Sequence, residues 1–427
     1  MGFLDKFFKK KQEPEINYEE IIFKSWGMFK EGLQNPNPDI RRSVEETVWY
    51  IDSPEGKRFF AVGMQEPDID NKSFCLLKLY ERGGWRLAEN IVKIAINEKE
   101  IPLSKREEMI YFIGGFSDPN ATPFLLTTLQ SDEEEIRIAG LCALSGVKNG
   151  EAIKPVYEHL NSVKSDLEKF ACGLVLYQYN HQDGKKILDE ILKNNKTAEF
   201  INKLQYLDFN KARAFIDDLL KENNSEIKIS IIKMIEDNRG VDILKNSLKD
   251  SDSNVVIDAL ERIISNGSRS ALEEIQKINP NNQTSKMIEY ALASFNDKKS
   301  LENIEKRVKE SKLDNETIED LKIMGLVYEQ DIAETIDKLL LPINNLDECN
   351  NETLDKIIDV EKLLIKYGKI SSILILSKYL DMKYLQKEDI IRWKTSCYAA
   401  VAILCIVERN TTYYTLRKKI KEEQNLK

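Results

Sequence analysis

The sequence predicts an all-α protein, an α-solenoid of about a dozen antiparallel helix pairs that winds as a right-handed superhelix or an arc. Three observations predict it. Only 18 glycines and 11 prolines occur in 427 residues, fewer than turn-rich all-β folds need. Apolar residues recur at helical spacing along the chain. Polar turns recur about every 30 residues, a period typical of stacked helix pairs.

Six similar segments open the second helix of a predicted pair. Each joins a polar turn to an aliphatic, small and aliphatic pattern, as in Ser131-Asp-Glu-Glu-Glu-Ile-Arg-Ile-Ala-Gly-Leu. The intervals between successive turns are 29, 64, 34, 59 and 27 residues, and the turns lie at Asp39, Asp68, Asp132, Asp166, Ser225 and Asp252. Each long interval spans two units, so one unit is about 30 residues.

Matching first helices lie between these turns. Ser53 and Pro54 open one of them, with a capping hydroxyl and a proline at the first helical position, where the missing N–H costs nothing. The run 227–235 is rich in β-branched residues, which favour strands. Its phase within the repeat nevertheless predicts a helix.

The two helices of a pair together carry a resemblance to a known family. The segment Gly150-Glu-Ala-Ile-Lys-Pro-Val and the segment from Ser131 to Leu144, with Arg137, Ala139 and Ala143 at their spacing, resemble HEAT repeats of the phycobilisome-lyase type. The resemblance implies an α-solenoid. It also implies that Asp132 and Arg137 belong to a structural ladder of turn acids and helix arginines.

The sequence divides into four segments by this resemblance. Residues 1–15 are a short basic amphipathic segment, and 16–117 are degenerate HEAT-like repeats. The best matches cover 118–265, while 266–427 hold divergent helical repeats and a cap. Since no helix pair covers its own apolar stripe, we expect neighbours to share one elongated core.

The N-terminal segment has an apolar and a basic face. At helical spacing, one face would carry Phe3, Leu4, Phe7 and Phe8, with Lys9, Lys10 and Lys11 beside it. Such a segment docks on an anionic membrane surface or on a partner protein. Capping of the first repeat is the third alternative.

Charge and composition bound the compartment and the partner. The net charge is -9. This acidic excess argues against a nucleic-acid ligand, because binding of nucleic acid needs a basic surface that neutralises phosphates. The six cysteines form no CxxC pair and read as reduced core thiols. The N-terminal residues lack the pattern of a signal peptide, so we expect none, and we expect the apolar run 397–407 to be too short to span a bilayer. We expect a cytoplasmic protein, peripheral on the inner face of the membrane if residues 1–11 bind lipid.

Motifs for catalysis are absent from the sequence. It has no phosphate-binding loop, dinucleotide fingerprint, zinc motif or nucleophile elbow, and only two histidines, His159 and His181. We therefore expect no enzyme, no cofactor and no metal site. One alternative is a HEAT-like DNA-binding protein or alkylpurine DNA glycosylase. The residues nearest to those that such a glycosylase uses are Asp39, Arg41, Arg42, Trp49, Arg82, Trp85 and Arg86.

The predicted function is that of a non-enzymatic scaffold or adaptor that binds another protein through the solenoid surface. Aromatic and arginine side chains are the usual anchors at interfaces. The candidates are Trp26, Trp49, Trp85, Arg392 and Trp393. An acidic body suits a basic partner, and an immunity or regulatory protein that sequesters a toxin or an enzyme is one specific form.

Overall fold

The computed structural model describes residues 17–222, 224–328 and 332–409. Over these residues it has 25 α-helices and no β-strand, so the predicted all-α class is confirmed. The chain divides into two compact units: unit 1 comprises residues 1–61 and 307–427, and unit 2 comprises residues 62–306. The helices α3 (Pro54–Val62) and α19 (Lys298–Glu310) contain the two boundaries.

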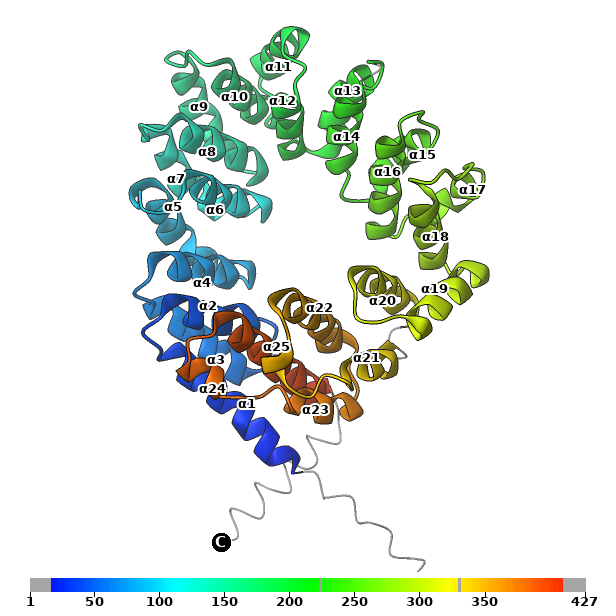
Figure 1. Ribbon diagram of the computed structural model, residues 1–427. Helices are drawn as coiled ribbons and strands as arrows, with labels where there is room; N and C mark the ends of the chain where they lie inside the picture. The colour runs from blue at the N-terminus through cyan, green and yellow to red at the C-terminus, as the bar shows by residue number, and fades with distance from the viewer. Residues whose placement is uncertain (1–16, 223, 329–331, 410–427) are drawn as a thin grey trace, which may run out of the picture. The chain divides into compact units, whose positions relative to one another are not determined.

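Unit 2 is built from helices that alternate between two sides of a row (Figure 1). The even-numbered helices each contact the next, from α4 to α18. They are α4 (Ile69–Glu81), α6 (Leu103–Gly115), α8 (Glu134–Gly146), α10 (Asp166–Gln178), α12 (Ala198–Lys203), α14 (Ser225–Lys233), α16 (Ser253–Ser265) and α18 (Ser285–Ser294). The odd-numbered helices lie on the other side: α5 (Ala88–Asn97), α7 (Thr122–Thr127), α9 (Ile153–Leu160), α11 (Gln182–Asn194), α13 (Phe209–Leu219), α15 (Val241–Ser247) and α17 (Leu272–Ile275).

The predicted polar turns begin the even-numbered helices. The side chain of Asp68 accepts a hydrogen bond from the backbone N–H of Asn71 at 2.9 Å, and Asp252 accepts from Asn254 at 2.9 Å. These side chains satisfy backbone donors that the first turn of a helix leaves free. The β-branched run begins in α14, where its repeat phase placed a helix.

The other ends of these helices repeat as well. Residues with positive φ follow α4, α6, α8, α10, α16 and α18, and they are Gly83, Ser117, Lys148, Asn180, Gly267 and Asn296. Their spacing is close to 30 residues or, between Asn180 and Gly267, to three such units. Hydrogen bonds between neighbouring pairs keep the same period: Asp208 N–H donates to Gln178 Oε1, and Ser268 Oγ donates to Asn238 Oδ1, each across 30 residues.

One apolar core extends through unit 2, from Leu76 to Phe295. Small residues let neighbouring helices approach closely within it. A Cβ on Gly140 would lie 1.7 Å from the Thr128 hydroxyl oxygen. The cysteines of this unit, Cys75, Cys142 and Cys172, are buried in the core as thiols.

Unit 1 joins the two ends of the described chain around one helix, α25 (Ile390–Arg409). This helix contacts α1, α2, α22, α23 and α24. The unit comprises α1 (Tyr18–Leu33), α2 (Pro38–Val48), α20 (Asn315–Tyr328), α21 (Ile332–Leu340), α22 (Asn351–Tyr367), α23 (Ile370–Ser377), α24 (Lys383–Gln386) and α25.

Helix α25 has 20 residues and extends beyond the apolar run 397–407 at both ends. By length and composition alone it is the one helix among the described residues that could cross a membrane, and 78% of its apolar window is buried inside the protein. Its side chains form the centre of unit 1, and a core helix of a soluble protein passes the same test.

Candidate binding site at the helix ends of unit 2

A cavity of about 440 Å³ lies where the carboxyl ends of several even-numbered helices of unit 2 come together. Its walls come from α6, α8, α10, the 3-10 helix η6 (Leu204–Tyr206) and the residues after α14. The residues that line it and bear on its chemistry are Glu108, Tyr111, Phe112, Lys148, Gln178, Gln205, Tyr206, Asp208 and Glu236. We call it the helix-end cavity.

Glycines bring the ends of α6 and α8 into backbone contact beside this cavity. A Cβ on Gly114 would lie 2.5 Å from the Cα of Ala143, and a Cβ on Gly146 would lie 2.4 Å from the carbonyl oxygen of Gly114. Only hydrogen fits at either position. The two helices therefore cross at their last turns, and this crossing brings the side chains around them to one place.

Two stacked tyrosines join α6 to η6. The rings of Tyr111 and Tyr206 lie 5.3 Å apart at an interplanar angle of 17°. The Lys203 ammonium donates to the Tyr111 hydroxyl at 2.6 Å and lies 4.8 Å from the ring centroid. Burial raises the pKa of both phenols above the ordinary value, so both are neutral, and the pair offers an aromatic surface to the cavity.

The charged side chains of the cavity are mostly acidic. Glu108, Asp208 and Glu236 are exposed carboxylates, against one exposed ammonium, Lys148. Within the described chain none of the four forms an ion pair. The carboxyl ends of helices add partial negative charge. The lining is therefore negative overall, with aromatic rings beside the carboxylates.

The adjacent end of α10 already holds a cation. Lys211 donates from its ammonium to the carbonyl oxygens of Tyr177, at 2.8 Å, and of Gln178, and to Asn180 Oδ1 at 2.9 Å. The same ammonium lies 5.4 Å from the centroid of the Tyr177 ring. A helix end with an aromatic neighbour thus binds an ammonium group within this unit.

A larger cavity, of about 740 Å³, lies where α8, α9 and α10 meet, and its charged groups are used within the protein. Arg137 donates to both carboxylate oxygens of Glu168, at 2.7 and 3.0 Å, and His159 Nε2 lies 2.8 Å from Glu168 Oε1. Burial raises the pKa of Glu168, but the hydrogen bonds from Arg137 and His159 outweigh it, so the pKa is lowered. We read this cluster as structural.

The same pairing occurs one repeat earlier. Arg106 donates to the two carboxylate oxygens of Glu133 at 2.6 and 2.8 Å. Arg137 therefore belongs to a ladder, as the resemblance implied, but its acids are Glu133 and Glu168. Asp132 is exposed instead, and Glu133 rather than Asp132 is the N-cap residue of α8.

The predicted aromatic and arginine anchors differ in how exposed they are. Trp85 is 44% exposed with the Arg86 guanidinium over its ring. Trp26 is half-buried and stacks on Phe59 at 5.1 Å, and Trp49 is also half-buried.

Two of these predicted anchors are structural. Trp393 is fully buried in the core of unit 1, so the prediction that it contacts a partner is wrong: its apolar neighbours on α25 place it inside. Arg392 is directed inward too, and donates to the carbonyl oxygens of Leu346 and Cys349 at 2.9 and 2.7 Å. The docking residues Phe3, Leu4, Phe7, Phe8, Lys9, Lys10 and Lys11 lie outside the described residues.

The residues collected for a DNA glycosylase do not form one site within a unit. Asp39, Arg41, Arg42 and Trp49 belong to unit 1, whereas Arg82, Trp85 and Arg86 belong to unit 2. Arg41 is buried and donates to the carbonyl oxygens of Asn35 and Pro36, both at 2.8 Å. Arg42 pairs with Glu46 at 3.0 Å.

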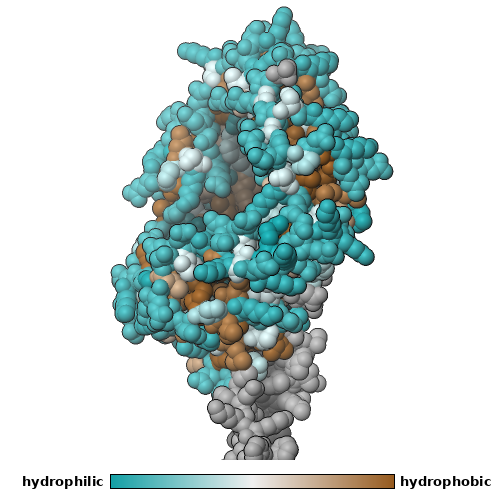
Figure 2. Space-filling model, turned by 45° about the vertical axis from the view of Figure 1, so that its right-hand side comes forward, coloured by the Kyte–Doolittle hydropathy of each residue, from teal (hydrophilic) through white to brown (hydrophobic). Residues whose placement is uncertain are grey.

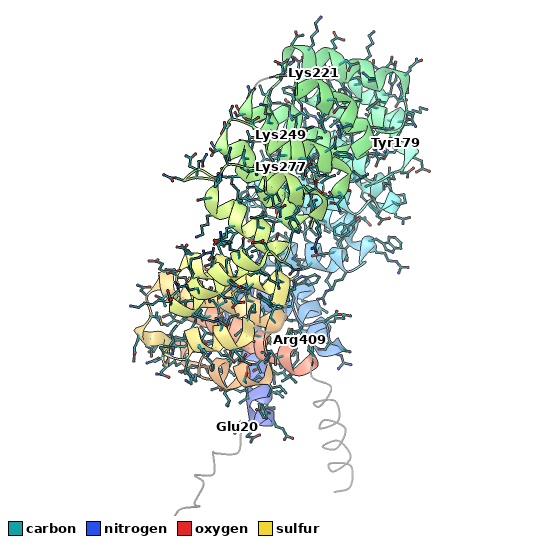
Figure 3. All side chains as sticks on the ribbon, turned by 90° about the vertical axis from the view of Figure 1, so that its right-hand side faces the viewer. Glu20, Tyr179, Lys221, Lys249, Lys277 and Arg409 are labelled. Atoms are coloured by element: carbon teal, nitrogen blue, oxygen red, sulfur yellow. The ribbon has the colours of Figure 1, made fainter. Side chains whose placement is uncertain are left out.

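Exposed lysines mark the opposite edge of unit 2. Lys221, Lys249 and Lys277 follow α13, α15 and α17 at intervals of 28 residues and lie in a row (Figure 3). A cation after the last turn suits the helix dipole. Acidic residues interrupt the row, since Asp218 pairs with Lys221 at 2.6 Å and Asp250 directly follows Lys249. This edge is therefore mixed in charge rather than continuously basic.

The surface is hydrophilic over most of the face in Figure 2, with small hydrophobic groups between. Among the residues that the structure describes, no group of three or more His, Cys, Asp or Glu side chains could hold a metal ion.

Comparisons with known proteins add no functional information. No protein-family model matches the chain. No curated protein matches it either. Among solved structures, the chain is similar to an engineered protein at 17% sequence identity, over 85% of this chain and 98% of that one, with a TM-score of 0.22. A likeness at that TM-score carries no argument about fold or function.

The sequence analysis does not predict the helix-end cavity. Its residues come from different repeats, and they carry no motif. The usable signal in the sequence is the pair Gly114-Gly115 after Tyr111 and Phe112. A glycine pair beside aromatic residues also indicates a close helix approach with aromatic side chains around it.

Proposed function

We propose that this protein is a HEAT-like α-solenoid that binds another protein and has no enzymatic activity of its own. The row of even-numbered helices, each in contact with the next, supports the solenoid. So do the recurring residues with positive φ and the hydrogen bonds across 30 residues. Stacked repeats of this kind offer extended surfaces for partners.

The observation that carries the binding role is the helix-end cavity. It combines aromatic rings, amide groups and unpaired carboxylates from five successive helix ends, and its volume is in the range of specific binding pockets. A negative lining favours a protein over a nucleic acid, because phosphates are bound by lysine and arginine. A scaffold, an adaptor or an immunity protein that sequesters a basic toxin or enzyme would use such a surface.

Two other partner classes make distinct demands. A nucleic-acid ligand requires a continuous basic surface, and the lysine edge of unit 2 is interrupted by Asp218 and Asp250. A membrane surface would be bound through residues 1–11, whose apolar and basic faces motivate that alternative. The protein-binding role is compatible with a cytoplasmic location, which we propose with it.

The test is a capture experiment with the full-length chain. We expect the tagged protein, cross-linked in its native cells and identified by mass spectrometry, to retain one protein species in a fixed ratio that nuclease treatment leaves unchanged. An unrelated tagged protein of similar net charge serves as the control. Loss of the retained material on nuclease treatment, or retention of the chain on duplex DNA in a salt-sensitive manner, would favour nucleic acid instead.

A separate experiment tests the membrane alternative. Intact chain and a variant lacking residues 1–12 are sedimented with vesicles that contain phosphatidylserine. Co-sedimentation of the intact chain alone would support a peripheral adaptor. We expect neither form to sediment if the surface of unit 2 carries the function.

A further inference from the structure

We propose that the helix-end cavity receives an arginine or lysine side chain from a basic segment of the partner protein. This inference rests on the proposed protein-binding function and names the chemistry of the partner. Its evidence is the charge of the lining, the cation already bound at the neighbouring helix end, and the aromatic wall.

The lining carries more carboxylates than ammonium groups, although Asp208 also interacts electrostatically with the nearby Lys211. Glu108, Asp208 and Glu236 are exposed, and within the described chain they form no ion pair. They belong to three different repeats, so no single helix accounts for their convergence. The backbone N–H of Asp208 donates to Gln178 Oε1 at 3.0 Å, and this hydrogen bond fixes the position of Asp208 beside α10. The carboxyl ends of α6 and α8 add negative potential in the same place, whereas the end of α10 is occupied by Lys211.

Lys211 provides an independent example in the same unit. Its ammonium is bound by two carbonyl oxygens at the end of α10, by Asn180 Oδ1 and beside the Tyr177 ring. The helix-end cavity likewise places aromatic rings and side-chain amides beside the ends of α6 and α8, with carboxylates in addition. The chain supplies Lys211 at the end of α10 and Lys203 at the Tyr111 ring, whereas the lining residues themselves include one ammonium group, the exposed Lys148.

The aromatic wall favours an organic cation over a metal ion. Tyr206 stacks on Tyr111, and Phe112 also lines the cavity. Guanidinium and ammonium groups bind to the faces of such rings. A metal ion would need several carboxylates close together, and the described residues include no such group. A cavity of about 440 Å³ also leaves room for the stem of a long side chain and the backbone next to it.

The test uses the full-length chain and a labelled peptide. The probe is a fluorescein-labelled, end-capped decapeptide in which arginine alternates with alanine, and the measurement is fluorescence anisotropy at physiological salt. The test variant is E108K/E236K, which reverses two exposed carboxylates of the cavity. The matched control is E190K/E302K, which makes the same charge change at two exposed positions of unit 2 away from it. Circular dichroism checks that both variants fold.

We expect E108K/E236K to weaken peptide binding about tenfold or more and the control to change it less than about threefold, because only nearby charge pairs add to the general attraction. The same peptide with citrulline in place of arginine keeps the shape without the charge and should not bind. Equal losses in both variants would overturn the inference, as they would reduce it to non-specific attraction. So would binding of the citrulline peptide, or binding of free L-arginine as tightly as the peptide.

Failure of this inference can be told apart from failure of the proposed function. A captured partner that binds wild type and E108K/E236K equally overturns the role of the cavity and leaves the protein-binding function standing. Nuclease-sensitive capture overturns the function itself. A captured partner whose retention falls only in E108K/E236K supports both.

Discussion

The indole N–H of Trp393 donates to the backbone carbonyl oxygen of Ile40, 3.3 Å away and 353 residues earlier in the chain. Trp393 is fully buried, on the helix at the centre of unit 1. Two further contacts join the same segments: Lys394 pairs with Glu46 at 2.7 Å, and Cys405 Sγ lies 3.5 Å from the carbonyl oxygen of Tyr50. The beginning and the end of the described chain therefore depend on each other for their core.

Replacing Trp393 should loosen both ends of the chain at once. We expect Trp393→Ala to lower the free energy of unfolding of unit 1 by about 3–5 kcal/mol, the usual cost of emptying a buried aromatic site. Hydrogen exchange should accelerate in α1 and α2 as well as in α25. The control is Trp85→Ala, which removes a 44% exposed ring and should cost less than about 1 kcal/mol. Faster exchange confined to α25 would contradict the dependence.

Local features of this fold could be predicted from the sequence, and distant pairings could not. Asp68 and Asp252 were placed at helix starts because capping depends on residues within one turn. The contact between Trp393 and Ile40 lies outside the 30-residue period, so no repeat pattern indicates it. The apolar run around Trp393 was visible, but a tryptophan suits an interface anchor and a core residue equally.

The candidate site was hidden for a related reason. Tyr111 and Tyr206 stack although 95 residues, about three repeats, separate them. Nearest-neighbour stacking predicts contacts about 30 residues apart, and η6 departs from that rule by reaching α6 and α8. Ser145 Oγ donates to the carbonyl oxygen of Tyr206 at 2.6 Å, which fixes this departure. The identity of such contacts depends on the path of the chain, which the residue pattern does not encode.

Removing one member of the buried pair Arg137–Glu168 should lower the free energy of unfolding more than replacing both members with apolar residues. Arg137→Met leaves the buried Glu168 carboxylate without its two guanidinium hydrogen bonds, and we expect a loss of about 3–5 kcal/mol in unfolding free energy. R137M/E168M removes both charges and should recover most of it. Urea denaturation measures both. Lys93→Met, which breaks the exposed pair with Glu89, should cost less than about 1 kcal/mol. A double variant as unstable as Arg137→Met would contradict this reasoning.

A buried carboxyl group should make unit 1 less stable as the pH rises. Glu361 on α22 is fully buried, and within the described chain neither carboxyl oxygen has a hydrogen-bond partner. Burial raises the pKa of Glu361 well above its ordinary value of 4.5. The folded state then keeps a proton that the unfolded chain releases above pH 4.5, so stability falls as the pH increases from there towards the folded-state pKa. Cys397 and Tyr379 face it, and burial raises the pKa of each.

Glu361→Met should therefore stabilise the protein at pH 7 by about 1–3 kcal/mol, the cost of an unsatisfied buried polar group. The gain should shrink as the pH falls to 4.5, where wild-type Glu361 is neutral in the folded state and half-protonated in the unfolded chain. Urea midpoints at pH 4.5, 6 and 7.5 give the comparison. Glu352→Met, on the exposed side of the same helix, should not change with pH in this way. A gain that is equal at all three values would show that packing rather than ionisation is responsible.

Two adjacent glycines at the end of α6 should respond in opposite directions to the same substitution. A Cβ on Gly114 would lie 2.5 Å from the Cα of Ala143, whereas a Cβ on Gly115 would meet no atom within 4 Å. Gly114→Ala forces α6 and α8 apart, and we expect a loss of about 1–3 kcal/mol. Gly115→Ala relieves the entropic cost of a helical glycine and should gain up to about 1 kcal/mol. Both are measured by urea denaturation.

Because the cavity depends on the crossing of α6 and α8, Gly114→Ala should also weaken arginine-peptide binding, while Gly115→Ala leaves the crossing intact. Equal stability of the two variants would mean that the close backbone contact does not hold these helix ends together.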